Sequence, residues 1–298
     1  GVSADQRIDV MAKQAADGTI YVFAVNTTAS QVSATFTING VRRGTVHVID
    51  EDRTVAFSEE TFQDTFSGYA VHIYQVVPPK IQFVKVSTAG EKLGTGPQVL
   101  TILAPGVAAG NTLIIHSAAQ ASSLTIARVT DSKENVYTVD VNSPWGGTSS
   151  RSHGLASGYI QTPLLAGDTI TIEWSSNAYR RYTTQVLEFS GIAQYNRVGQ
   201  AAQKRGYGSS FAAGPVTSTG EEELVLGAVL VNGANSVYTP GKGFSTLSSR
   251  VSSLTGFSVA LLEEYTISSK GDEQFTANGT FPQLRNWGAV VGTYKSSK

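Results

Sequence analysis

The feature that most constrains this chain is a short alternation of apolar and polar residues that recurs along most of its length. Thr19 to Val25 shows it first, and Ser33 to Ile38 and Thr45 to Ile49 repeat it. A period of two indicates a strand with one buried face. The turn-forming pairs Asp17-Gly18 and Asn39-Gly40 separate these segments. Helical periodicity is nearly absent, so the sequence predicts an all-β fold of sandwiches or barrels.

A proline pair marks the first domain boundary. Residues 69–77 read as a final strand, and Pro78-Pro79-Lys80 follows directly. Proline cannot donate to a strand ladder and stiffens a short linker. We therefore predict a small antiparallel β-sandwich over residues 1–77, of about seven strands, with a linker at 78–80.

The remaining residues contain an internal repeat. The pair Gly167-Asp168 precedes Trp174, and Gly271-Asp272 precedes Trp287 in the same manner. The segment 111–115 is likewise echoed by 222–226. Two degenerate copies of one β unit explain this pattern. We predict a tandem β-sandwich or jelly-roll region, with copies at 81–192 and 193–298 packed together.

The overall composition excludes several functions. Charged residues make up 15% of the chain and the net charge is −1, so no basic stripe favours nucleic acid or an anionic membrane. Without cysteine there are no disulfides and no thiolate zinc sites. No apolar run approaches the roughly 20 residues that span a bilayer. The chain begins Gly1-Val2-Ser3 with no signal peptide, and we expect a piece of a longer secreted protein.

Residues 6–77 resemble the C-terminal β-sandwich that follows the (β/α)8 barrel of many glycoside hydrolases. The segments 17–26 and 66–74 carry the resemblance. It implies a unit that packs on a catalytic barrel and seldom contributes catalytic groups.

Residues 81–298 resemble an accessory domain of bacterial and archaeal secreted enzymes, for which carbohydrate binding is the usual suggestion. The segments that carry this resemblance are 109–114, 129–132, 135–138, 187–191, 262–265 and 287–291. The implied parent is an extracellular, polysaccharide-degrading glycoside hydrolase. Its catalytic domain would be covalently linked upstream of this chain, and its polysaccharide would be the partner.

No catalytic or cofactor site is expected from the residues themselves. Glu263-Glu264 and Glu221 to Glu223 are adjacent carboxylates, and neighbouring strand residues point to opposite faces, so they cannot clamp one glycosidic bond. The histidines lack metal-binding spacings, and His72 is expected to face an adjoining domain. The polar turn Asp131 to Asn135 is a weak candidate for structural calcium, against which Lys133 argues.

Candidate sugar-binding residues combine aromatic faces with planar polar groups. Trp174 and Trp287 share the phase of apolar neighbours and are assigned to the core. Trp145 lies in the Gly-rich segment 142–151, which reads as a loop and favours a ligand role. The carbohydrate-binding candidates are Trp145, Tyr179, Arg180, Tyr182, Arg205 and Tyr207. Here tyrosine would stack on sugar rings and arginine would bind hydroxyls or uronate carboxylates.

Two functions are favoured by the sequence, and a third, an independent adhesin that binds a protein, is compatible with it but has no supporting motif. One is a non-catalytic carbohydrate-binding accessory region that tethers an enzyme to its glycan. The alternative is a structural spacer or cell-surface domain that binds no sugar. The distinguishing feature is whether Trp145, Tyr179, Tyr182 and Tyr207 share one exposed surface.

Overall fold

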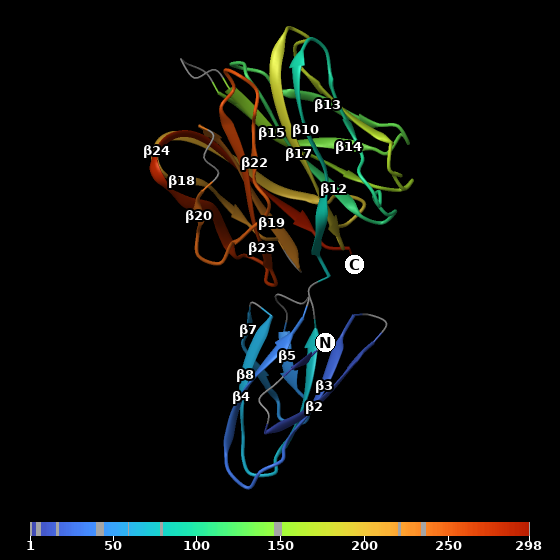
Figure 1. The fold of residues 1–298 in the computed structure, drawn as a ribbon, viewed down its shortest axis with the longest axis vertical. Helices are drawn as coiled ribbons and strands as arrows, with labels where there is room; N and C mark the ends of the chain where they lie inside the picture. The colour runs from blue at the N-terminus through green and yellow to red at the C-terminus, as the bar shows by residue number, and fades with distance from the viewer. Residues whose placement is uncertain are drawn as a thin grey trace. The chain divides into compact units, whose positions relative to one another are not determined.

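The computed structural model describes residues 2–3, 7–15, 18–39, 45–58, 60–77, 80–145, 151–219, 222–233 and 237–297. Every regular element in these ranges is a strand, and all pairs are antiparallel, which confirms the predicted all-β class (Figure 1). No helix in these ranges could span a membrane. The chain divides into two compact units, Gly1–Pro79 (unit 1) and Lys80–Lys298 (unit 2). The linker prolines 78 and 79 lie outside the described residues.

Unit 1 is a sandwich of two antiparallel sheets, ordered β1-β4-β8-β7 and β2-β3-β9-β5-β6. Its strands are β1 (Val2–Ser3), β2 (Ile8–Gln14), β3 (Ile20–Asn26), β4 (Val32–Ile38), β5 (Thr45–Val48), β6 (Arg53–Val55), β7 (Phe57–Ser58), β8 (Thr61–Phe66) and β9 (Val71–Val77). The alternation seen in the sequence is real, because β4 buries every second residue. Phe36 and Phe62 stack between the sheets with ring centroids 4.7 Å apart, beside the buried Tyr74.

Unit 2 contains a five-stranded, a three-stranded and a seven-stranded sheet. Its strands are β10 (Gln82–Gly94), β11 (Gln98–Thr101), β12 (Thr112–Ala119), β13 (Ile126–Asp131), β14 (Tyr137–Trp145), β15 (Arg151–Tyr159), β16 (Thr169–Trp174), β17 (Arg180–Ser190), β18 (Val198–Thr217), β19 (Glu223–Asn232), β20 (Thr239–Pro240), β21 (Ser245–Thr246), β22 (Arg250–Val251), β23 (Val259–Ser268) and β24 (Gln274–Lys295).

The two large sheets of unit 2 share one strand order. The five-stranded sheet runs β10-β17-β12-β15-β14, and the seven-stranded sheet runs β18-β24-β19-β23-β21. In each, the first strand pairs with the last long strand, which then pairs with the central strand. The topology therefore repeats along the chain in the way that the sequence echo does.

The five-stranded sheet forms a closed sandwich with the three-stranded sheet β11-β16-β13. Leu113, Ile115, Trp174 and Val186 fill the space between them. Side chains also close the corners between the sheets. The Asn142 amide oxygen accepts from Ile126 N–H at 2.8 Å on one side, and on the other Thr88 Oγ1 donates to Thr101 O at 2.7 Å.

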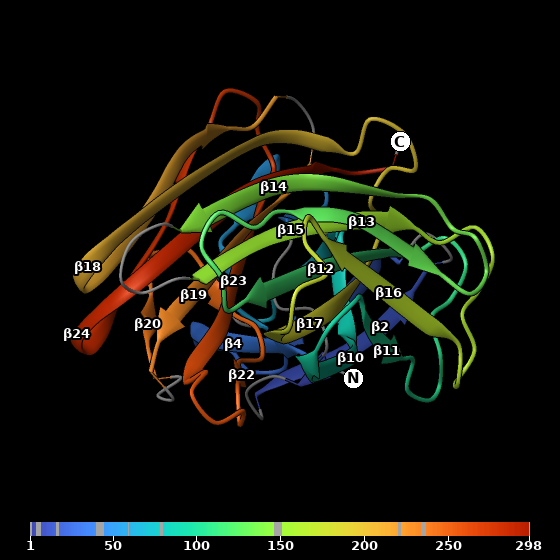
Figure 2. The same cartoon turned by 90° about the horizontal axis from the view of Figure 1, so that it is seen from above.

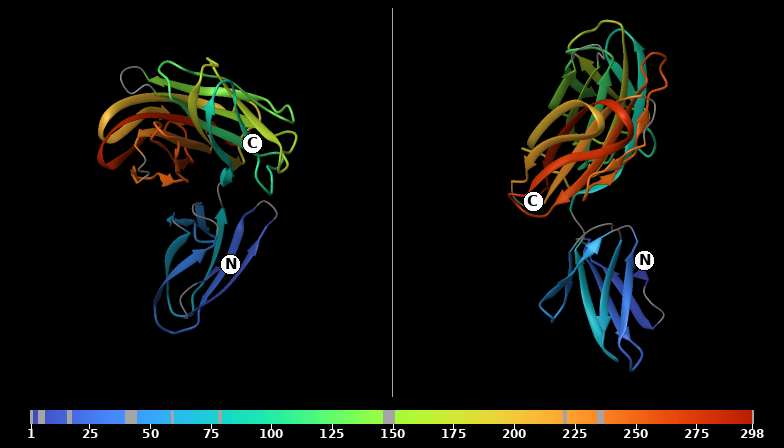
Figure 3. Two further views of the ribbon diagram at one scale, coloured as in Figure 1. Left: turned by 45° about the horizontal axis from the view of Figure 1, so that its top comes forward. Right: turned by 90° about the vertical axis from the view of Figure 1, so that its left-hand side faces the viewer.

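The seven-stranded sheet covers part of its own face. Strands β18 and β24 pair along most of their length and form a long ribbon that curls over the sheet (Figure 3). Phe211 and Phe281 lie on the curled part, with ring centroids 5.4 Å apart. They pack with Trp287 and Val229 in one buried cluster.

The five-stranded and seven-stranded sheets also pack on each other. Ile114 and Leu187 from one sheet meet Leu226 and Val290 from the other in a shared core. The central strand β12 is consequently buried at every position, and so is nearly all of β19. This double burial explains why both strands read as continuous apolar runs rather than as alternating ones.

Candidate functional site

Several predicted site residues gather at one end of unit 2. All five strands of the five-stranded sheet have one terminus at the same end of the sheet, as shown by the pairs Gly94–Arg180, Ala119–Tyr182, Ala119–Ser152 and Trp145–Arg151. This end also adjoins β18, through Arg205. We call it the basic end, and define it by Arg151, Arg180, Arg181 and Arg205 with Tyr179 and Tyr207. The strands that contribute these residues are β14, β15, β17 and β18, with the turn before β17 (Figure 2).

Tyr179 and Arg180 stand where β17 begins. Tyr179 lies in the turn after β16, and its side chain is 58% exposed. The Arg180 guanidinium donates to the carbonyl of Tyr179 at 2.8 Å. That bond holds a cation beside an exposed aromatic ring, which is the pairing expected for a sugar contact.

Arg205 and Tyr207 lie two residues apart on β18 and therefore share one face. The Tyr207 side chain is 67% exposed and its strand partner is Asn286. Arg205 Nη1 donates to Pro144 O on β14 at 3.0 Å. The same face holds Gln203, whose amide oxygen accepts from Ser143 Oγ at 3.1 Å. These contacts join the edges of the two large sheets at the basic end.

Tyr182 does not belong to this surface. It is fully buried and packs in the sandwich core beside Trp174, with ring centroids 6.2 Å apart. Because β17 begins at Arg180, Tyr182 falls in phase with Val186 on the core face. The sugar-binding role predicted for Tyr182 is therefore wrong, whereas the core assignment of Trp174 and Trp287 is confirmed.

The structure also corrects the local setting of Trp145. The sequence reads 142–151 as a loop, but β14 continues through Trp145, whose backbone pairs with Arg151. The Trp145 side chain and residues 146–150 lie outside the described part of the chain. The predicted stacking role of Trp145 stays a prediction.

Three residues that are not among the candidates read from the sequence, Arg151, Arg181 and Gln120, lie at the same end of the sheet. Gln120 follows β12, and its backbone N–H donates to Arg181 O at 2.8 Å. Its amide oxygen accepts from Arg181 Nη1 at 2.9 Å, and its amide nitrogen donates to Gly256 O at 2.9 Å. Arg151 starts β15 and lies over the Phe257 ring, 6.0 Å from its centroid. No local motif signals this grouping, which arises from strand register.

A buried polar cluster joins the two large sheets deeper in unit 2. His116 Nδ1 lies 2.7 Å from Glu263 Oε1, and His116 Nε2 lies 3.1 Å from His153 Nδ1. Gln185 donates to the other Glu263 oxygen at 2.6 Å. Burial lowers the pKa of His116 to about 3 and raises that of Glu263 well above its ordinary value. In the neutral forms that burial favours, Glu263 donates to His116 and His116 donates to His153.

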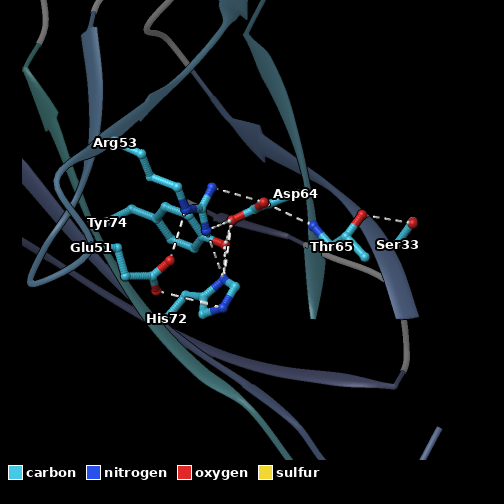
Figure 4. A network of polar contacts seen from close by, with 7 residues as sticks. All are labelled: Ser33, Glu51, Arg53, Asp64, Thr65, His72 and Tyr74. Atoms are coloured by element: carbon cyan, nitrogen blue, oxygen red, sulfur yellow. Dashed lines mark hydrogen bonds and ion pairs between the residues drawn. The ribbon is translucent and has the colours of Figure 1, made fainter. Parts of the chain in front are cut away.

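Unit 1 holds a second polar network, centred on Asp64 (Figure 4). Arg53 donates to both carboxylate oxygens at 3.0 and 2.7 Å, and Tyr74 Oη donates at 2.7 Å. Burial alone would raise the pKa of Asp64, but these bonds hold it below its ordinary value. His72 Nδ1 lies 3.1 Å from the same carboxylate. Contrary to the sequence expectation, His72 therefore points into unit 1.

The acidic residues considered in the sequence have structural partners. Asp131 accepts hydrogen bonds from the Lys133 and Asn135 backbone N–H groups and from Tyr137 Oη. The carboxylate of the polar turn is therefore bound by protein hydrogen-bond donors. Lys133 pairs instead with Asp168 at 3.3 Å. Within the described ranges, no group of three or more His, Asp and Glu residues could hold a metal ion.

The paired glutamates Glu263 and Glu264 point to opposite faces of β23, as neighbouring strand residues do. Glu263 faces the five-stranded sheet through His116, whereas Glu264 lies beside Gly227 and Ala277 on the opposite face. Glu223 accepts from Thr219, and Glu222 accepts from Ile81 N–H at 2.6 Å. Glu221 lies outside the described residues.

No family model matches the chain, and no curated protein matches it in sequence. Solved structures that resemble it include one described as "Crystal structure of BuGH86wt in complex with neoagarooctaose". That similarity has 14% sequence identity and a TM-score of 0.24, and it covers 62% of this chain and 34% of the other. The chain thus has a distant structural similarity to part of a glycoside hydrolase, and it spans about a third of that protein's chain.

Proposed function

We propose that this chain is a non-catalytic, carbohydrate-binding accessory region of a secreted polysaccharide-degrading enzyme, and that the basic end of unit 2 binds the glycan. The observation that carries the proposal is the exposure of Tyr179 and Tyr207 at the same strand ends as Arg180 and Arg205. Sugar rings stack on exposed aromatic faces through their C–H groups, and guanidinium groups bind hydroxyls or carboxylates. The catalytic domain would be supplied by another part of the parent protein.

The architecture limits where a glycan could bind on unit 2. The central strands β12 and β19 are buried on both faces, so the middle of neither large sheet is open to a polymer. Strand ends, loops and sheet edges remain. Of these, the basic end offers two exposed tyrosines beside arginines.

A structural spacer is the second candidate. The observation that favours it is the burial of Tyr182, Trp174 and Trp287, which removes three aromatic rings from any binding surface. In this case the exposed tyrosines would be ordinary surface residues. Solubility and stability would then be insensitive to every polysaccharide.

Affinity electrophoresis through gels that contain cellulose, xylan, mannan, β-glucan, pectin or agarose tests the proposal. We expect retardation by at least one glycan. A Y179A/Y207A variant should lose about tenfold or more in affinity, because each stacked ring contributes about 1 kcal/mol or more.

Tyr195→Ala is the matched control. Tyr195 is 76% exposed and lies on the connection between β17 and β18. Arg197 on the same connection binds Ser157, at the end of the five-stranded sheet that lies opposite the basic end. Its loss should leave retardation unchanged. Retardation that vanishes in Y195A but persists in Y179A/Y207A would move the site. No retardation by any glycan would favour the spacer.

A further inference from the structure

Arg151, Gln120 and Arg181 lie side by side on one face of the five-stranded sheet. Gln120 extends the central strand β12 and flanks Arg181 of β17 on one side and Arg151 of β15 on the other. With strands about 4.8 Å apart, the two arginine backbones are separated by about 10 Å. Two long guanidinium side chains at that spacing can reach one small group that lies between them, beside the Gly256 segment that the glutamine amide contacts.

The hydrogen bonds of the two guanidinium groups are incomplete. Arg181 Nη1 is satisfied by Gln120, but the Nε–H groups of Arg181 and Arg151 are buried and have no hydrogen-bond partner among the residues that the structure describes. Buried donors without partners are rare in folded proteins, because each costs about 1–3 kcal/mol. An acceptor from outside the chain would complete both groups.

The charges of these arginines are also uncompensated. No ion pair among the described residues involves Arg151 or Arg181. Glu91 on β10, one strand from Arg181, is already engaged by the Ser253 backbone and hydroxyl and by Arg250. Burial lowers the pKa of Arg151, with no carboxylate to offset it. The Arg151 guanidinium carbon lies 6.0 Å from the Phe257 ring centroid, a cation–π contact that uses none of its N–H donors.

We propose that Arg151, Gln120 and Arg181 bind the oxyanion substituent of an acidic polysaccharide, a sulfate ester or a uronate carboxylate. This deepens the glycan-binding function proposed above and rests on it. A guanidinium presents Nε–H and Nη–H as a fork that matches two oxygens of one oxyanion. The glutamine amide, which already bonds Arg181 and Gly256, holds the Arg181 guanidinium in place. The exposed Tyr179 and Tyr207 at the same end supply faces for the sugar rings.

The size of the cluster favours a glycan over a nucleic acid. Nucleic-acid binding proteins neutralise many phosphates along a basic track, whereas this chain has a net charge of −1 and the proposed site holds only two arginines. A single substituted sugar residue requires only one such point.

Affinity electrophoresis of the full chain against a sulfated galactan, polygalacturonate, neutral agarose and a short DNA duplex tests the inference. We expect retardation by an acidic glycan, weakened by added salt and by competing inorganic sulfate. An R151Q/R181Q variant should lose about a hundredfold in affinity, about tenfold for each charged hydrogen-bonding fork. The exposed pair R128Q/K242Q removes the same charge elsewhere and should change affinity by less than about twofold.

The choice of ligands distinguishes a sulfate ester from a carboxylate, and it distinguishes failure of the oxyanion site from failure of the glycan-binding function. Retardation by the sulfated glycan alone assigns a sulfate ester, and retardation by polygalacturonate alone assigns a carboxylate. Binding to neutral agarose that R151Q/R181Q leaves intact overturns the oxyanion site and keeps the glycan-binding function. Binding to DNA as tight as to any glycan overturns the site as a glycan site. Absence of all glycan binding overturns both. Thermal unfolding monitored by tryptophan fluorescence verifies that each variant is folded.

Discussion

The Asp64 network of unit 1 and the His116 cluster of unit 2 both place polar side chains between two sheets, but with opposite electrostatics. Asp64 is ionised, paired with the partly exposed Arg53 and close to solvent. His116 and Glu263 are both fully buried, and burial favours the neutral form of each. A charged network near solvent depends on salt and acid, whereas a neutral buried cluster depends on each hydrogen bond.

The two units can be followed separately in one sample. All three tryptophans, Trp145, Trp174 and Trp287, belong to unit 2, and the single methionine, Met11, belongs to unit 1. Tryptophan fluorescence therefore reports on unit 2, and the methyl NMR signal of Met11 reports on unit 1.

The largest expected effect is the loss of the Glu263 hydrogen bonds. Glu263→Leu leaves His116 without its partner at Nδ1 and removes one acceptor from Gln185, in a site closed to water. We expect the free energy of unfolding of unit 2 to fall by about 3 kcal/mol. Urea titration followed by tryptophan fluorescence measures it.

Glu263→Gln is the matched control, because its amide keeps the shape and one hydrogen bond to each neighbour. It should cost less than half as much as Glu263→Leu. Equal losses in the two variants would mean that packing, and not hydrogen bonding, accounts for the stability of the cluster.

The next effect is a stability maximum of unit 2 in mild acid. The folded-state pKa values of His116 and His153 lie below 6.5. Their contribution to the free energy of unfolding of unit 2 is therefore complete above pH 6.5 and is lost as the pH falls. The folded-state pKa of Glu263 lies well above 4.5, and burial raises those of Glu264 and Asp140 to about 8 and about 6. The contribution of the two glutamates to the stability of unit 2 is complete below pH 4.5, and that of Asp140 is complete below pH 3.8. Both contributions are lost as the pH rises.

The two opposing sets place the maximum between the unfolded-state values of 4.5 for glutamate and 6.5 for histidine. Above it, stability should fall by at most about 1.4 kcal/mol per pH unit for each carboxyl group that keeps its proton. Fluorescence melts at about pH 5.5 and about pH 8 measure the difference, and Glu263→Gln should reduce it. Greater stability at the higher pH would contradict the neutral cluster. Asp64 of unit 1 predicts no comparable loss, since its contribution disappears only in acid below its unfolded-state value of 3.8.

The sequence predicted strands well wherever one face of a sheet is open to solvent. The alternation in β4 and β16 matches their burial, and so Trp174 was placed correctly in the core. The same reasoning failed for Tyr182, because Thr184, a polar residue bonded to Gln98 within the buried sandwich, interrupts the apolar phase of β17. It failed at Trp145 because the glycines that follow suggest a loop, while the register with Arg151 extends the strand.

The candidate site was only partly readable for a different reason. Tyr179-Arg180 and Arg205–Tyr207 are local pairs, and the sequence showed them. Arg151 and Gln120 approach Arg181 only through the order β17-β12-β15, which no local pattern encodes. His116 meets a glutamate 147 residues away for the same reason. Groupings of this kind depend on which strands become neighbours.

The smallest expected effect is on unit 1. Arg53→Gln removes the charge that binds both Asp64 oxygens and also contacts Glu51. Because the Arg53 side chain is 35% exposed, water and salt screen its attraction, and we expect a loss of about 1 kcal/mol. Thermal unfolding followed by the Met11 methyl signal measures it, with Lys13→Gln, which removes an exposed charge on β2, as the control.

Salt then separates the two kinds of network. Raising the salt concentration to about 1 M shortens the screening length to about 3 Å, so most of the difference between native unit 1 and Arg53→Gln should disappear. The difference between native unit 2 and Glu263→Leu should stay, because that cluster carries no net charge and is closed to ions. A salt-sensitive Glu263 effect would instead contradict a cluster that is closed to ions and to water.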